Sequence, residues 1–128
     1  MQQLLQATEY MHAQGICHRD LKPDNIIIST TDPTIGADTE TDCRSVLDNS
    51  TTLINQLRHK AMMGEHLQIK VIDFNVSVDF KKTRNNLIQG FTGVREWSAP
   101  ETRTSLYYNT KADLWTLGCI LYFLCTGK

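Results

Sequence analysis

Two short runs of β-branched and other apolar residues, each next to a polar loop, constrain the fold of this chain most. Residues 26–28 follow the polar stretch HRDLKPDN, and residues 67–72 end directly before Asp73. Runs of this length and composition predict β-strands. If the two strands pair as an antiparallel hairpin, the loop before the first and the loop after the second lie at the same end of the ribbon. The sequence therefore predicts that Asp73 lies beside the polar residues of loop 18–25.

The residues gathered by that hairpin have the composition of a phosphate and magnesium site. A lone acid after a strand is ordinarily a turn former or a helix cap, so Asp73 gains a chemical role only through its neighbours. Magnesium prefers hard oxygen ligands, and Asp73 and Asn25 supply a carboxylate and an amide. Lys22 offers a compact cation for a phosphoryl oxygen. Asp20 is a carboxylate able to orient and deprotonate an attacking hydroxyl.

Helical patterns stand at both ends of the chain. In residues 1–15, Leu4, Thr8 and Met11 recur on one stripe, and Gly15 is a C-terminal stop. An apolar helix is predicted from about Lys111 onward. Helical spacing predicts that five of its side chains are core residues: Trp115, Leu117, Ile120, Leu121 and Phe123.

Between the two predicted strands, the composition changes to Thr, Asp, Ser and Asn, which predicts a polar insertion at about 29–66. Two alternatives remain for its second half. Residues 45–63 have an amphipathic pattern through Leu53, Ile54 and Leu57, which would suit a helix. A mobile surface loop is the favoured interpretation because the segment is polar and carries few apolar residues.

Composition excludes several classes of function. Thirteen basic residues against fourteen acidic ones leave a net charge of -1, so no broad field for nucleic acid or an anionic membrane is expected. The four cysteines form no Cys-x-x-Cys pair, which favours free thiols in a reducing compartment over thiolate metal binding. The first residues lack the pattern of a secretory signal, and the longest apolar run is too short to span a bilayer. We therefore expect a cytoplasmic or nuclear chain.

Four short motifs together resemble a eukaryotic protein kinase of the serine/threonine type. Residues 18–25, HRDLKPDN, match the catalytic loop of that family throughout. Three more motifs follow in the family's order: DFN at 73–75, APE at 99–101 and DLWTLG at 113–118. The resemblance covers nearly the whole chain except the predicted insertion.

The resemblance implies a role for each polar residue. Asp20 would be the catalytic base, and Lys22 would steady the transferred phosphate. Asn25 and Asp73 would hold Mg2+, and Ile27 would lie against the adenine ring of ATP. ATP and Mg2+ are thus the implied cofactors, and the partner is a protein substrate. Lys22 followed by Pro is the family's pattern for serine and threonine acceptors.

The resemblance also implies a fold. We expect an α+β protein-kinase-like fragment of the C-terminal lobe over residues 1–128, mainly helical with a short β-hairpin and with the N-terminal lobe absent. Asp113 would accept hydrogen bonds from the backbone of the catalytic loop and would not touch ATP. His18 and Phe74 would be packing residues.

Four departures from the family pattern bear on activity. Asn75 replaces the glycine of Asp-Phe-Gly, and Asn tolerates the left-handed backbone that this turn would need. Val94 stands where a threonine hydroxyl usually reaches the catalytic aspartate, although Thr92 is nearby. Arg19 suggests control by phosphorylation, yet residues 84–91 contain no Ser or Thr near the usual acceptor position at Gly90, which leaves Thr83 and Thr92 as candidates. The chain also carries no Gly-rich phosphate loop or strand lysine.

Two functions of different classes follow. The first is part of a Ser/Thr protein kinase that transfers the γ-phosphoryl group of ATP to protein hydroxyls, with this chain alone incomplete and inactive. The alternative is a pseudokinase or truncated non-catalytic fragment that acts through protein binding, which Val94 and Asn75 favour. Because a binding module has no need of all four of Asp20, Lys22, Asn25 and Asp73, their joint presence favours the enzyme.

Overall fold

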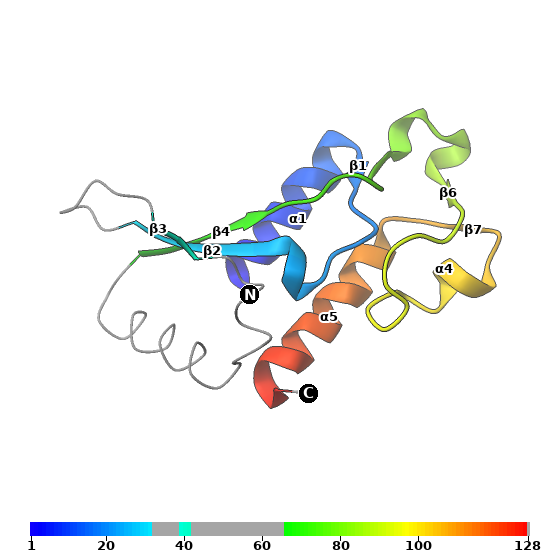
Figure 1. Cartoon of the computed structure of the whole chain (residues 1–128). Helices are drawn as coiled ribbons and strands as arrows, with labels where there is room; N and C mark the ends of the chain where they lie inside the picture. Colours follow the sequence, from blue (N-terminus) through cyan, green and yellow to red (C-terminus); the bar gives the residue numbers. More distant parts are fainter. Residues whose placement is uncertain (32–38, 42–65, 128) are drawn as a thin grey trace. The chain divides into compact units, whose positions relative to one another are not determined.

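The computed structural model describes residues 1–31, 39–41 and 66–127. They form two compact units, one made of residues 1–22 with residues from 73 onward, and the other of described residues between 23 and 72. Figure 1 traces both units along the chain. The described part contains α-helices and small antiparallel sheets, in agreement with the expected α+β class, and none of its helices is long and apolar enough to cross a membrane.

Helix α1 (Gln2–Gln14) opens the first unit and buries the predicted stripe of Leu4, Thr8 and Met11. Gly15 ends it in the left-handed conformation with φ 93°, and its N–H donates to the carbonyl of His12 over 3.0 Å. Glycine adopts this backbone without a Cβ penalty, so the predicted helix stop is confirmed.

Helix α5 (Lys111–Thr126) begins where the sequence predicted and contacts α1 within the first unit (Figure 1). Leu117 and Ile120 are buried, as expected, and Phe123 is partly buried in an edge-on contact with Trp97. Trp115 and Leu121 are 50% and 45% exposed, so the prediction that both are core residues is wrong. The helix is apolar around most of its circumference, and spacing alone therefore cannot select the buried face.

Short pairings connect the rest of the first unit. Strand β1 (Ile16–Cys17) pairs with β5 (Val78–Asp79), and β6 (Ile88–Gln89) pairs with β7 (Tyr107–Tyr108), both antiparallel. Two 3-10 turns, η2 (Phe80–Lys82) and η3 (Arg84–Asn86), and helix α4 (Glu101–Thr104) lie along the same segment. These elements surround a core cluster of Cys17, Ile88, Ala99, Tyr108 and Ala112.

The second unit holds the predicted strand pair. Turn η1 (Pro23–Asn25) leads into β2 (Ile26–Thr31), which pairs antiparallel with β4 (His66–Val71). The register joins Ile26 to Val71, and the N–H of Ile72 donates to the carbonyl of Asn25 over 3.0 Å. The predicted pairing is thus confirmed, and both the residue before the first strand and the residue after the second lie at one end of the ribbon.

The ribbon is larger than the predicted short hairpin. Strand β3 (Thr39–Thr41) pairs with the other edge of β2, which gives a three-stranded sheet in the order β3-β2-β4. The sheet thus extends into the predicted insertion at about 29–66. Polar and β-branched residues such as Thr39 and Thr41 suit an edge strand, but three residues give too short a pattern to be recognised in sequence. The remainder of the insertion, including the candidate helix at 45–63, lies outside the described residues.

Candidate active site

Loop 18–25 divides between the two units, with residues 18–22 in the first and 23–25 in the second. Within the first unit, Lys22 Nζ donates to Asp20 Oδ2 over 3.0 Å, and the side chains are 19% and 14% exposed. A partly exposed ion pair of this kind fixes the direction of the carboxylate more than it stabilises the fold. Two of the predicted site residues are therefore brought together.

A second donor reaches the other oxygen of Asp20. The backbone N–H of Val94 donates to Asp20 Oδ1 over 3.2 Å. The approach depends on Gly93, which has φ +84°, and a Cβ there would lie 2.7 Å from the carbonyl oxygen of Arg19 and 2.8 Å from Asp20 Oδ1. Only glycine combines that backbone with that clearance. Each oxygen of Asp20 is thus oriented by a separate donor.

This geometry revises the expectation for Val94. Its side chain supplies no hydroxyl, as the sequence predicted, but its main chain makes the contact to Asp20. Thr92 does not take the place of the missing hydroxyl, because its Oγ1 is buried without a hydrogen-bond partner among the described residues. Sequence reasoning missed the backbone donor, since an N–H is present at every residue but proline and carries no signal in the side chain.

Asp113, at the start of α5, holds the backbone of loop 18–25 through hydrogen bonds. Its Oδ2 accepts the N–H of His18 over 3.0 Å, and its Oδ1 accepts the N–H of Arg19 over 2.9 Å. The side chain is 1% exposed. Burial raises the pKa of Asp113, but hydrogen bonds from His12 and from these two backbone groups outweigh it and hold the pKa below its usual range. The predicted supporting role of Asp113 is confirmed.

His12 is a partner that sequence reasoning missed. Its Nε2 lies 2.8 Å from Asp113 Oδ2, and the ligand atoms of His12, Cys17 and Asp113 lie within 4.8 Å of one another. Burial and then the Asp113 charge raise the pKa of the Cys17 thiol, so the sulfur stays protonated. Because both oxygens of Asp113 already accept N–H groups, we interpret this cluster as a structural hydrogen-bond network. A polar residue facing inward from α1 was the available signal.

The DFN element lies in the first unit and begins two residues after the last residue of β4. Asp73 is exposed and has a left-handed backbone with φ 63°, and its Oδ1 accepts the N–H of Asn75 over a long 3.4 Å. Such an exposed carboxylate retains acceptor capacity for a cation. Asn75 is not among the described residues of positive φ, so the left-handed position of this turn is Asp73, and Asn75 does not use the left-handed backbone that Asn tolerates.

Packing around this element agrees with part of the prediction. The rings of His18 and Phe74 have centroids 4.8 Å apart, and His18 is fully buried. Phe74 is 44% exposed, so its contact with His18 covers only part of the ring. The ring contact links loop 18–25 to the DFN element within the first unit.

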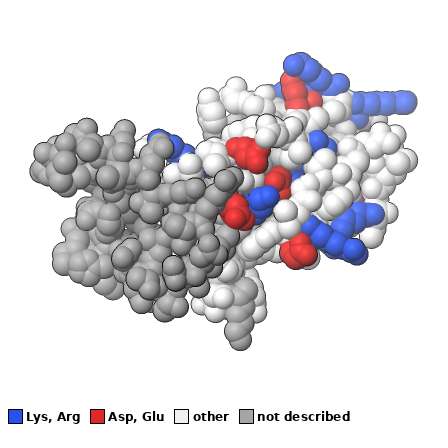
Figure 2. Space-filling model, viewed as in Figure 1, with Lys and Arg blue, Asp and Glu red and all other residues white. Residues whose placement is uncertain are grey.

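Asn25 and Ile27 belong to the second unit. Asn25 is buried at the end of η1, and Ile27 is partly buried on β2 opposite Lys70. The structure thus joins Asp20 to Lys22, places Asp73 in the same unit, and holds the other two predicted residues in the sheet unit. Charged side chains of both signs lie on the face shown in Figure 2.

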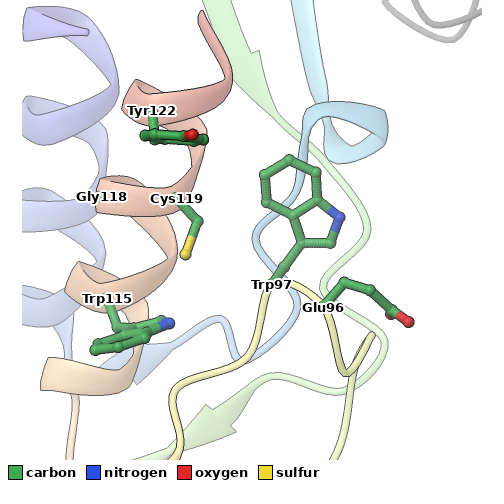
Figure 3. Close-up of a pocket in the computed structure, with 6 residues that line it drawn as sticks. All are labelled: Glu96, Trp97, Trp115, Gly118, Cys119 and Tyr122. Carbon is green, nitrogen blue, oxygen red and sulfur yellow. The ribbon is translucent and has the colours of Figure 1, made fainter. Parts of the chain in front are cut away.

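An open groove of about 680 Å³ lies elsewhere in the first unit. Figure 3 shows Trp115, Cys119 and Tyr122 on α5 and Trp97 across from them. Neither Asp20 nor Lys22 lines it, and its lining consists of three aromatic side chains with Gly118, Cys119 and the carboxylate of Glu96. The groove is therefore not the site formed by Asp20 and Lys22.

Comparison with known proteins agrees with this geometry. The chain matches the protein kinase domain family over residues 1–128. It is 31% identical to serine/threonine-protein kinase AFC3 of Arabidopsis thaliana and 35% identical to sperm motility kinase 2B of Mus musculus, each over 98% of this chain. It is also 30% identical to 3-phosphoinositide-dependent protein kinase 1 of Rattus norvegicus. The chain spans 28%, 19% and 16% of the lengths of these three relatives. The motifs, their geometry and these matches show that the chain belongs to the protein kinase domain family and represents part of such a domain.

Proposed function

We propose that this chain carries the acceptor side of a Ser/Thr protein kinase active site, which transfers the γ-phosphoryl group of ATP to protein serine and threonine hydroxyls. The observation that carries the proposal is the double hold on Asp20, by Lys22 at one oxygen and by the Val94 N–H at the other. Both oxygens of Asp20 are oriented, and the side chain remains partly exposed. These properties suit a base that accepts the proton of a substrate hydroxyl.

Asp20 is the base in this proposal. The substrate hydroxyl donates a hydrogen bond to Asp20, its oxygen attacks the γ-phosphorus in line, and the bond to the leaving ADP oxygen breaks while Asp20 takes the proton. Lys22 stabilises negative charge on the transferred phosphoryl oxygens. The ammonium group of Lys22 lies 3.0 Å from Asp20 Oδ2. The same cation can therefore orient the base and stabilise the charge on the transferred phosphoryl group.

Asn25 and Asp73 are the proposed magnesium ligands, and Ile27 the proposed contact of the adenine ring. Mg2+, when bound, neutralises charge on the phosphates of ATP. The exposed Asp73 carboxylate and the amide of Asn25 are hard oxygen donors, which supports this assignment. We assign the chain to the C-terminal lobe of the domain, with a polar insertion at about 29–66, in a cytoplasmic or nuclear protein. The buried and exposed cysteines, which are free thiols among the described residues, agree with a reducing compartment.

A second candidate is a non-catalytic module that binds another protein, which the departures at Val94 and Asn75 favour. The Val94 N–H contact weakens that argument, because Asp20 keeps a donor without a threonine hydroxyl. Asp73 also retains its exposed carboxylate although residue 75 is Asn. The enzyme is therefore the function that the geometry supports best.

The deciding experiment measures phosphoryl transfer from radiolabelled ATP to a library of Ser, Thr and Tyr peptides by the full-length protein. Asp20→Asn keeps the shape of the side chain and removes the base, so the rate should fall by about a thousandfold. Asp24→Asn is the matched control, because it removes a carboxylate from the same loop that has no assigned role. Equal rates for the unaltered protein and Asp20→Asn would overturn the proposal, and transfer to Tyr alone would overturn the acceptor class.

A further inference from the structure

The hydroxyl of Tyr108 connects the core cluster to residues 90–94, the stretch whose Val94 N–H donates to Asp20. Tyr108 lies on β7 and is 5% exposed, and its hydroxyl donates to the carbonyl of Gly90 over 3.0 Å. Burial raises the pKa of Tyr108, although the neighbouring Arg19 guanidinium partly opposes it. The phenol is therefore neutral and remains a hydrogen-bond donor at physiological pH.

Arg19 connects the Tyr108 hydroxyl to Val76, which follows the DFN element. Its Nε donates to the carbonyl of Val76 over 2.6 Å, and its guanidinium lies beside the Tyr108 hydroxyl. Its own N–H is held by Asp113. Arg19 thus links loop 18–25, the residues after DFN and Tyr108 in one network.

Gly90 and Val94 are separated by only three residues, 91–93, along the chain. The Tyr108 contact therefore fixes one end of a short stretch whose other end donates to Asp20. Strand β6, paired with β7, holds the residues immediately before Gly90. With both ends held, the stretch has little freedom to carry the Val94 N–H away from the carboxylate.

We infer that Tyr108 is a positioning residue for Asp20, and that its neutral hydroxyl holds residues 90–94 in place without an added phosphate. Residues 84–91 contain no Ser, Thr or Tyr, and the hydroxyl of Thr92 is buried, so residues 84–94 offer no exposed side-chain hydroxyl for a phosphate. Arg19 already has partners in Val76 and in the tyrosine. The effect on rate rests on the proposed kinase activity, but the effect on the order of residues 90–94 does not.

The variant Tyr108→Phe isolates the hydroxyl, because the ring stays in the core cluster with Cys17, Ile88 and Ala112. Tyr107→Phe is the matched control: it removes the same hydroxyl from the neighbouring residue of β7, which is 51% exposed and has no side-chain hydrogen bond among the described residues. Successive residues of a strand point to opposite faces, so the control leaves Gly90 untouched.

The experiment compares three full-length proteins, the unaltered one and the two variants, by hydrogen exchange and by steady-state kinetics. In Tyr108→Phe, amide exchange at residues 90–94 should rise about tenfold, the effect of one lost hydrogen bond. The kcat should fall by a similar factor while KM for ATP stays unchanged. Tyr107→Phe should match the unaltered protein in both readouts. Unchanged exchange in Tyr108→Phe, or the same rise in Tyr107→Phe, would overturn the inference.

Treatment with a broad-specificity protein phosphatase tests independence from phosphate. The rate of the unaltered protein should survive the treatment, and its loss would overturn that part of the inference. If the unaltered protein shows no transfer above Asp20→Asn, the proposed function fails instead. The exchange rates at 90–94 would still confirm or reject the positioning role of Tyr108.

Discussion

Asp113 and Asp20 lie in the same unit and serve the same loop, yet their surroundings are opposite. Asp113 is 1% exposed and accepts two backbone N–H groups and lies 2.8 Å from the ring nitrogen of His12. Asp20 is 14% exposed and is held by one ammonium and one N–H. A buried carboxylate is stable only when its oxygens are well supplied with donors, and one so supplied has little basicity left. The difference separates a structural anchor, Asp113, from the proposed base, Asp20.

The difference between Asp113 and Asp20 is tested most strongly by replacing each carboxylate with the amide of the same shape. Asp113→Asn puts an NH2 group among buried N–H donors, so we expect the free energy of unfolding to fall by about 3 kcal/mol. Asp20→Asn should change stability little, because its ion pair is partly exposed. Urea unfolding of the full-length protein measures both. Equal losses of stability would contradict the division into anchor and base.

Lowering the pH should weaken the stabilisation that Asp113 provides, because the pKa of Asp113 is lowered in the folded protein. Its pKa is lower in the folded protein than in the unfolded chain, so the unfolded state binds more protons as the solution becomes acidic. The stabilisation is complete above the unfolded value near pH 4 and is lost as the pH falls through the folded pKa. Unfolding measured between about pH 5 and 2 should therefore lose less stability in Asp113→Asn than in the unaltered protein. Parallel pH profiles would show that Asp113 is not the group responsible.

The smallest effect is expected where backbone geometry alone is changed. Asn75→Gly keeps the N–H that donates to Asp73 and removes a side chain at a position without positive φ. Its cost should be at most about 1 kcal/mol, through the greater freedom of Gly in the unfolded chain. Thermal melting and the phosphoryl transfer rate measure it. A large gain in rate would show that Asn75 restrains the site and would favour the non-catalytic candidate for the natural protein.

Features that depend on local patterns could be predicted from the sequence. The first helix could be predicted from the stripe of Leu4, Thr8 and Met11 and from Gly15 after it. Both signals, a 3.6-residue period and a left-handed C-terminal residue, act within one element. The pairing of β2 with β4 followed from two β-branched runs. The role of Asp113 followed from the family resemblance, because it belongs to a recognisable motif.

Features that depend on contacts between distant segments could not. The two-residue strands β1, β5, β6 and β7 are too short for any period to be visible. Asp is among the residue types enriched in the left-handed region, but that preference is too weak to place a positive φ at Asp73 from the sequence. The approach of the Val94 N–H to Asp20 and of the Tyr108 hydroxyl to Gly90 arises only when the segments have packed.

Gly93 and Val94 also suggest how sequences with this geometry can diverge. Because the main chain of Val94 makes the contact to Asp20, any residue except proline at position 94 keeps the N–H that donates to the carboxylate. At position 93, any side chain would collide with the carbonyl of Arg19 and with Asp20 itself. Position 93 therefore requires glycine, whereas the adjacent position 94, whose N–H makes the hydrogen bond to Asp20, tolerates other side chains.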